Sequence, residues 1–253
     1  MRRAITREVS PAIAQCELTH LTREPIDVDR ARRQHDAYEQ VLRDAGYTVT
    51  RLAAEGQIPD SVFVEDIAVV FNELAIVTRP GAESRRAETA AVADALWPLR
   101  PLHSVDPPGT IDGGDVLTVG KRVFIGESRR TNADAIAQMR AILVPQGYTV
   151  TAVAVRGCLH LKSAVTAIAD DMLLINRDWA PSAPFQPFRF LDVDAAEPMG
   201  ANALRLHDRV IYPMTFPRTR ARIEDRGIRV VEVDVSEIAK AEGAVTCCSL
   251  ILG

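Results

Sequence analysis

Five polar or reactive side chains recur along the chain at nearly constant spacing. They are Glu65, Asp112, His160, Asn202 and Cys247, and successive members lie 47, 48, 42 and 45 residues apart. A thiol, an imidazole and a carboxylate supply the nucleophile, the proton carrier and the orienting group of covalent catalysis. Because equivalent positions of a repeating chain converge on one axis, this spacing predicts that the five side chains share a common centre.

Acidic side chains near this set outnumber the single orienting group that such catalysis needs. They are Asp60, Glu65, Asp66 and Asp115. Anions close to a thiol raise its pKa from about 8.5 and suppress the reactive thiolate. A bound cation neutralises the carboxylates and favours the thiolate. The sequence therefore predicts a positively charged substrate.

A second repeat lies in the segments between these residues. The sequence GYTVT at 46–50 returns at 147–151, and 227–231 is a looser third copy. Four segments have the apolar periodicity of helices, and they are 28–45, 87–96, 133–144 and 220–225. Three of these helices end shortly before a copy of the repeat, where a glycine supplies the left-handed stop.

Paired apolar runs joined by short polar turns alternate with the helices and predict β-hairpins. The pairs are 62–71 with 74–78, 115–119 with 123–126, 163–169 with 172–176, and 203–206 with 210–213. The repeating unit is a hairpin, a helix and a strand, and the chain of 253 residues holds about five such units.

The last unit is cut short after one strand at 244–252, and the run 4–13 at the other end lacks a partner. Pairing these two strands removes both exposed edges and closes a ring. We therefore predict an α/β fold, a five-bladed propeller with pseudo-fivefold symmetry, in a single catalytic domain over residues 1–253. The hairpins disfavour a doubly wound sheet, in which helices separate the strands throughout.

Composition excludes several classes of function. Lys and Arg number 30 against 34 Asp and Glu, so the net charge of −4 offers no basic excess for nucleic acid. The charged start and the lack of an 18-residue apolar run argue against a targeting signal or a membrane partner. Four scattered cysteines do not form a disulfide framework and favour a reducing, cytoplasmic location.

Seven segments in order carry a family resemblance. They are FVED at 63–66, RPGA at 79–82, SRR at 84–86, DGGD at 112–115, RTN at 130–132, LHLKS at 159–163 and TCCS at 246–249. Together they resemble the dimethylarginine dimethylaminohydrolase family. This family belongs to the guanidine-modifying superfamily, whose fold is the five-bladed α/β propeller called the pentein fold.

The resemblance implies hydrolysis of asymmetric dimethylarginine and monomethylarginine to citrulline and dimethylamine or methylamine. It implies a covalent S-alkylthiouronium on Cys247, with His160 as acid and then base, and Asp112 orienting His160. The partner is the small methylated arginine, no metal or cofactor is expected, and the chain is a monomer or homodimer. Alternation along a strand, together with the family pattern, selects Cys247 over Cys248.

The substrate-binding residues implied by the resemblance are Leu18, Asp60, Phe63, Glu65, Asp66, Arg85, Arg130 and Ala241. Among them, Asp66 is expected on the guanidinium nitrogens, and Arg85 and Arg130 on the α-carboxylate. Ala241 is expected to contact the amino acid end through its backbone. Asp115 either contacts substrate or braces its own turn.

Two alternatives remain open at this point. One is an arginine deiminase-like hydrolase that acts on unmethylated arginine, although such enzymes are generally longer. The other is a non-catalytic propeller that binds a partner and lacks the cysteine, histidine and acid in register.

Overall fold

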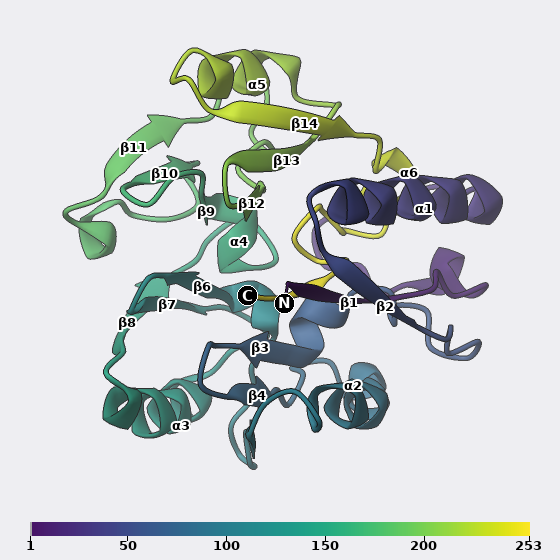
Figure 1. Cartoon of the computed structure of the whole chain (residues 1–253), viewed down its shortest axis with the longest axis vertical. Coiled ribbons are helices and arrows are strands. Elements are labelled where there is room, and N and C mark those ends of the chain that lie inside the picture. Colours follow the sequence, from purple (N-terminus) through teal and green to yellow (C-terminus); the bar gives the residue numbers. More distant parts are fainter. Residues whose placement is uncertain (1) are drawn as a thin grey trace.

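Five sheets of three strands each form the frame of the computed structural model, which describes residues 2–253. In every sheet the first two strands pair antiparallel and the second pairs parallel with the third. The sheets are arranged around a central axis (Figure 1). The predicted five-bladed α/β propeller is confirmed.

Four of the sheets follow the chain from one hairpin to the next. They are β3 (Ala68–Val70), β4 (Ala75–Val77) and β5 (Leu102–Ser104); β6 (Val116–Val119), β7 (Arg122–Glu127) and β8 (Thr149–Ala154); β9 (Val165–Ala167), β10 (Met172–Ile175) and β11 (Arg189–Asp192); β12 (Leu204–Leu206), β13 (Arg209–Pro213) and β14 (Arg229–Val233).

The fifth sheet joins the two ends of the chain. Strand β1 (Arg3–Arg7) pairs antiparallel with β15 (Leu250–Leu252) and parallel with β2 (Thr48–Leu52). Figure 1 shows the two termini side by side near the axis. The predicted closure of the ring is therefore confirmed.

Helices lie on the outside of the ring, between the second and third strands of their units (Figure 1). They are α1 (Val28–Asp44), α2 (Thr89–Leu96), α3 (Ala133–Leu143) and α5 (Pro217–Glu224). Helix α1 begins where the Asp27 carboxylate accepts from the backbone N–H of Arg30, and α3 where Asn132 accepts from Ala135. Gly46 and Gly147 follow them with positive φ angles of 84° and 81°.

The unit of β9, β10 and β11 departs from the predicted pattern, because its described residues include no outer α-helix between β10 and β11. A loop with one short 3-10 turn, Ala183–Phe185, connects β10 to β11 instead. Phe185 is fully buried, and its ring centroid lies 4.7 Å from that of Phe124 in β7. The segment therefore fills by aromatic packing the space that a helix fills in the other units.

The hairpins begin later than the sequence predicted, because a tight turn precedes the first strand. Residues Val64–Ile67 and Gly113–Asp115 are 3-10 helices, the helix α4 (Leu161–Ala164) precedes β9, and residues 245–248 form a turn. A Cβ on Gly113 would overlap the carbonyl oxygen of Glu65, so two of these turns pack backbone against backbone. The assumption that Cys247 and Cys248 lie on a regular strand was wrong, as it was for Glu65 and Asp66.

Helix α1 packs directly on the turn that carries Cys247. The buried Tyr38 hydroxyl donates to the carbonyl oxygen of Val245 at 2.9 Å and lies 2.6 Å from the Ser249 hydroxyl. The turn is thereby fixed from its outer side. A short helix, α6 (Ser236–Ala239), precedes the same segment in the chain.

No helix in the described part of the chain combines the length and apolar character needed to cross a membrane.

Candidate active site

Three of the turns that precede the hairpins border one cavity. The other lining residues come from loops, among them the loop before α1 and the loop after α6. The cavity is lined by Glu17, Asp60, Phe63, Asp66, Arg85, Arg130, Leu159, His160, Ala241, Glu242, Gly243 and Cys247. Eight of these twelve were expected from the sequence.

The thiol and the imidazole predicted to react together face this same cavity. Cys247 lies in the turn 245–248, where its backbone N–H donates to Ala244 and its Sγ accepts from the Ala244 N–H at 3.4 Å. His160 lies at the N-terminal cap position of α4. Cys248, in contrast, is 1% exposed and belongs to the hydrophobic core beside α1. The structure therefore places Cys247, and not Cys248, at the cavity. The two residues lie in a turn, so the predicted alternation along a strand is not the reason.

Asp112 is buried behind His160 and is hydrogen-bonded to its ring. Its Oδ2 lies 3.1 Å from His160 Nε2, and its Oδ1 accepts from the backbone N–H of Gly81 at 2.8 Å. The second ring nitrogen, Nδ1, lies 3.8 Å from Asp66 Oδ1. The imidazole is thus held between two carboxylates, which is the environment that stabilises its charged form.

The surrounding carboxylates and burial move the pKa values of both reactive groups. Burial alone would lower the pKa of His160, but the charge of Asp66 and the hydrogen bond that the ring donates to Asp112 outweigh it and raise the pKa to about 9. Burial, helped by the charges of Glu65 and Asp66, raises the pKa of the Cys247 thiol well above its ordinary value. At neutral pH the free site therefore holds a neutral thiol and an imidazolium.

Replacement of Asp112 by asparagine should lower the pKa of His160 from about 9 toward the ordinary value of about 6.5. The imidazolium loses its hydrogen-bonded carboxylate, so its proton dissociates at lower pH, and the alkaline limb of any His160-dependent activity moves the same way. NMR titration of the His160 ring in both proteins measures the shift. Asp134→Asn, in the first turn of α3, is the control, and an unchanged His160 titration in Asp112→Asn would contradict this account.

Asp66 is held in place by groups from two units. Its Oδ1 accepts from the Gly114 N–H at 3.0 Å and its Oδ2 from Arg85 Nη1 at 2.6 Å. Burial would raise the pKa of Asp66, but the positive charges of His160 and Arg85 outweigh it and lower the pKa. Asp66 is therefore an ionised carboxylate on the cavity wall, available to a cationic group.

Arg85 faces the cavity, but its donors are largely engaged within the protein. The guanidinium donates to Asp66, to both carboxylate oxygens of Glu88, and to the carbonyl oxygens of Asp60 and Phe63. A guanidinium has five N–H donors, so little remains for a ligand carboxylate. The expected clamp by Arg85 stays a prediction that this arrangement does not favour.

Arg130 is more available than Arg85. Its Nη2 donates to the Thr19 hydroxyl at 3.3 Å and its Nη1 lies 3.7 Å from Asp112 Oδ2. The side chain is 12% exposed and lines the cavity. Arg130 is thus the cation best placed to receive an anionic group there.

Two expected ligand residues do not line the cavity. Glu65 points away from it, because its carboxylate accepts from Lys162 Nζ and from the Thr246 hydroxyl on the other side of the turns. Leu18 packs against the core beside α1, while its neighbour Glu17 lines the cavity. Asp115 braces its own turn, since its oxygens accept from Ser128, Thr131 and the Leu161 N–H.

Glu242 is a cavity residue that no sequence pattern indicated. It adopts a left-handed backbone with φ of 57°, and its carboxylate accepts from the backbone N–H groups of Thr19, His20 and Leu21 at 3.0, 2.5 and 2.7 Å. These contacts join segments more than 220 residues apart, so no local pattern reveals them. Glu242 thereby holds the loop 17–21 against the cavity.

The Asp66, Asp112 and His160 ligand atoms all lie within 4.8 Å of one another, a grouping that metal sites also have. Here the carboxylate oxygens already accept from Gly114, Arg85, Gly81 and His160. The neighbouring guanidinium groups of Arg85 and Arg130 also oppose a bound cation of high charge. The grouping therefore fits proton transfer better than metal binding.

Comparison with known proteins identifies the family of this chain. The family model described as N,N dimethylarginine dimethylhydrolase, eukaryotic, matches residues 20–183. An N(G),N(G)-dimethylarginine dimethylaminohydrolase from Streptomyces coelicolor is 42% identical over 253 residues, covering 99% of this chain and 97% of the relative. The chain belongs to the dimethylarginine dimethylaminohydrolase family.

Further members of the dimethylarginine dimethylaminohydrolase family agree in sequence and in structure. The enzyme of that name from Pseudomonas aeruginosa is 39% identical over 226 residues, covering 88% of this chain and 89% of the relative. A solved structure of a cysteine-to-serine mutant of the Pseudomonas aeruginosa protein, complexed with citrulline, superposes with a TM-score of 0.93. It is 36% identical and covers 99% of this chain and 98% of that one. The family likeness therefore extends over all five units.

Proposed function

We propose that the protein hydrolyses asymmetric dimethylarginine and monomethylarginine to citrulline, releasing dimethylamine or methylamine. The observation that carries this proposal is the joint placement of Cys247, His160 and Asp66 around one cavity, with Asp112 hydrogen-bonded behind His160. The names of the relatives from Streptomyces coelicolor and Pseudomonas aeruginosa support the substrate class.

The carboxylates of Asp60 and Asp66 are assigned to the guanidinium group of the substrate. Each carboxylate has about four lone-pair sites, so Asp66 accepts from a ligand while keeping Arg85 and Gly114. Burial raises the pKa of Asp60, and a bound cation reverses this effect by stabilising the ionised form. Arg130 is assigned to the α-carboxylate, where a planar guanidinium binds two oxygens at once.

The first half of the reaction transfers the substrate carbon to sulfur. The guanidinium charge beside Cys247 lowers the thiol pKa, and the thiol releases its proton to water as the substrate binds. The thiolate then attacks the central guanidinium carbon and forms a C–S bond. His160 donates its proton to the methylated nitrogen, the C–N bond breaks, and the neutral amine departs from an S-alkylthiouronium.

The second half returns the enzyme to its starting state. His160, now neutral, removes a proton from water, and the oxygen attacks the same carbon. The C–S bond breaks and its electron pair returns to Cys247 as the thiolate. The thiolate takes up the proton that the new hydroxyl oxygen loses as the ureido C=O forms, so citrulline is released and the neutral thiol is restored. Asp112 holds the imidazole in one orientation through both proton transfers.

Substrate entry requires the loop 17–21 to move. The cavity has about 20 Å³ of free volume, whereas a single water needs roughly 10–15 Å³. The space thus suits about one water and is too small for an amino acid. The contacts that close it are the three backbone hydrogen bonds to Glu242 and the bond from Arg130 to Thr19.

Citrulline release from dimethylarginine, monomethylarginine and arginine, measured side by side, tests the proposal. We expect kcat/KM for the methylated substrates to exceed that for arginine at least about tenfold, the order that a methyl group gives in a fitted pocket. Cys247→Ser protein serves as the blank. Preference for arginine would instead support a deiminase, and binding without turnover of all three would support a non-catalytic propeller.

A further inference from the structure

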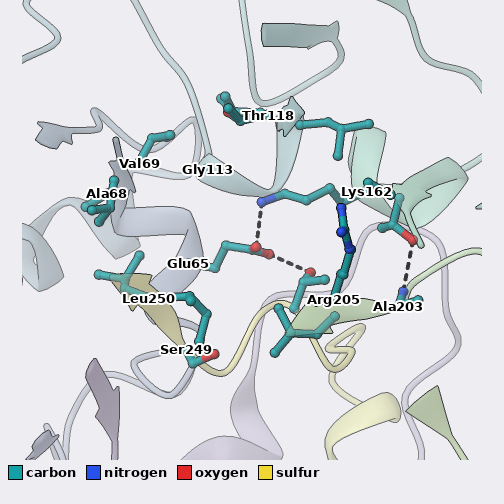
Figure 2. Close-up of a pocket in the computed structure, with 18 residues that line it drawn as sticks. Glu65, Ala68, Val69, Gly113, Thr118, Lys162, Ala203, Arg205, Ser249 and Leu250 are labelled. Atoms are coloured by element: carbon teal, nitrogen blue, oxygen red, sulfur yellow. Dashed lines mark hydrogen bonds and ion pairs between the residues drawn. The ribbon is translucent and has the colours of Figure 1, made fainter. Parts of the chain in front are cut away.

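A second cavity lies on the far side of the turns from the one that holds Cys247. We call it the axial pocket, and it has a volume of about 210 Å³. The first strand of every sheet contributes to its wall, through Val69, Leu117, Thr166, Leu204 and Leu250. Figure 2 shows Lys162 and Glu65 pointing toward one another inside it.

Neighbouring residues of the same turn face the two cavities. Cys247 lines the active-site cavity while Thr246 lines the axial pocket, and Asp66 and Glu65 divide in the same way. Each turn thus spans the wall between the two cavities. Groups in the axial pocket therefore act directly on the backbone that carries the nucleophile.

Glu65 is attached to the nucleophile turn at two points. Its backbone N–H donates to the carbonyl oxygen of Cys247 at 3.1 Å, and its Oε2 accepts from the Thr246 hydroxyl at 2.7 Å. Its Oε1 accepts from Lys162 Nζ at 2.5 Å. One carboxylate therefore links the cation on α4 to the residue that precedes Cys247.

Asn202 fixes Thr246 from another unit. Its side-chain oxygen accepts from the Thr246 N–H at 3.2 Å, and its amide nitrogen donates to the Thr246 hydroxyl and to the Lys162 carbonyl oxygen, both at 3.0 Å. Thr246 is thus held by hydrogen bonds at its backbone and at its hydroxyl. The mechanism above uses none of Glu65, Lys162, Asn202 and Thr246.

The negative charge of Glu65 disfavours the thiolate form of Cys247 unless a cation offsets that charge. Glu65 and Asp66 both raise the pKa of the Cys247 thiol, whereas Lys162 lowers it. Tyr38 and Cys248 also interact electrostatically with this thiol, and both are buried. Burial is the main cause that raises their pKa values well above the ordinary values, so both groups are neutral near pH 7.

Other charged groups near these residues have their own partners. His160 is held by Asp112 and Arg85 by Asp66 and Glu88. Arg205, also on the wall of the axial pocket, pairs at 2.8 Å with Asp170, whose side chain is 93% exposed. Lys162 is therefore the cation that directly offsets Glu65.

We propose that Lys162 is a positioning residue that lets Glu65 and Asn202 clamp the nucleophile turn without leaving an uncompensated carboxylate beside the Cys247 thiol. The proposal rests on the assignment of Cys247 as nucleophile made above. It gives the axial pocket a task in the reaction although no substrate atom enters it.

The test follows the alkylation of Cys247 by iodoacetamide against pH, by mass spectrometry of the modified peptide. In Lys162→Met we expect modification to be about tenfold slower at a fixed pH below the thiol pKa, as a rise of one pKa unit gives. Lys162→Arg keeps the cation and should behave like wild type. The double variant Lys162→Met/Glu65→Gln removes both charges and keeps an oxygen for Thr246, so it should return the profile to wild type.

Glu65→Gln alone gives a result of opposite sign and does not depend on the stability of Lys162→Met. It leaves the cation unopposed near the thiol, so the alkylation profile should move to lower pH. Arg205→Met is the matched control, because it removes another cation of the same pocket and should leave the profile unchanged.

Two results would overturn the proposal. One is a wild-type profile in Lys162→Met, and the other is a double variant that reacts as slowly as the single one, which is the sign of a purely structural role. With methylated substrate, Lys162→Met should lower kcat more than it changes KM. Alkylation needs no substrate. If the variants show the expected alkylation profiles but the wild-type protein does not turn over methylated substrate, the proposed function is rejected and this inference stands.

Discussion

Replacing Cys247 by serine should lower citrulline formation from dimethylarginine at least about 10³-fold, because a hydroxyl is a far weaker nucleophile than a thiolate. The thiol faces the cavity shared with His160 and Asp66. The neighbouring carboxylates that we assign to the substrate guanidinium would still be present, so substrate binding should survive while kcat collapses. Steady-state kinetics with isothermal titration of the substrate separates these two effects.

Cys248→Ser is the matched control for this result. Cys248 is 1% exposed, and its thiol packs in the core, 3.7 Å from the Ala244 carbonyl oxygen. A buried serine hydroxyl costs about 1–3 kcal/mol of stability if its hydrogen bond is poor, so thermal unfolding should fall while most activity remains. The reverse pattern, with Cys248→Ser inactive and Cys247→Ser active, would reject the assignment of the nucleophile.

The ring of units was predictable because its signals are local and repeated. Hairpin and helix periodicities recur about every fifty residues, and the copies at 46–50 and 147–151 mark equivalent strands. An unpaired strand at each end of the chain leaves few alternatives to closure. The spacing also predicted that Asp112, His160 and Cys247 lie together; Asp112 is hydrogen-bonded to His160, and His160 and Cys247 line one cavity.

What the spacing did not reveal is the side of the axis on which each residue lies. Glu65 and Asp66 are adjacent, yet one faces the axial pocket and the other the active-site cavity. The spacing counts residues along the chain and does not specify on which side of the Val64–Ile67 turn a side chain lies, because this turn is a 3-10 helix and not a regular strand. The loop contact of Glu242 is equally hidden, because it depends on tertiary packing alone. The cytoplasmic location and the monomer or homodimer state stay predictions, since the fold of one chain specifies neither.

His160→Gln should show which steps need the imidazole. Removing a general acid and base costs about 10²- to 10⁴-fold in rate, and in this site one side chain serves both halves of the reaction. Glutamine cannot activate water, so any substrate that reaches the first half should remain as an S-alkylthiouronium on Cys247. The mass of the Cys247 peptide after brief incubation with a substrate carrying a better leaving group measures this accumulation.

A matched control variant tests whether the effects of His160→Gln come from the loss of this imidazole. His103→Gln changes an exposed histidine on the outer strand β5 and should leave turnover and adduct level unchanged. Since two carboxylates raise the pKa of His160 to about 9, the wild-type imidazole begins the cycle protonated and can release the amine before it activates water. If His160→Gln turns over the activated substrate at the wild-type rate without accumulating adduct, the histidine does not act on water. The second half of the proposed reaction would then be wrong.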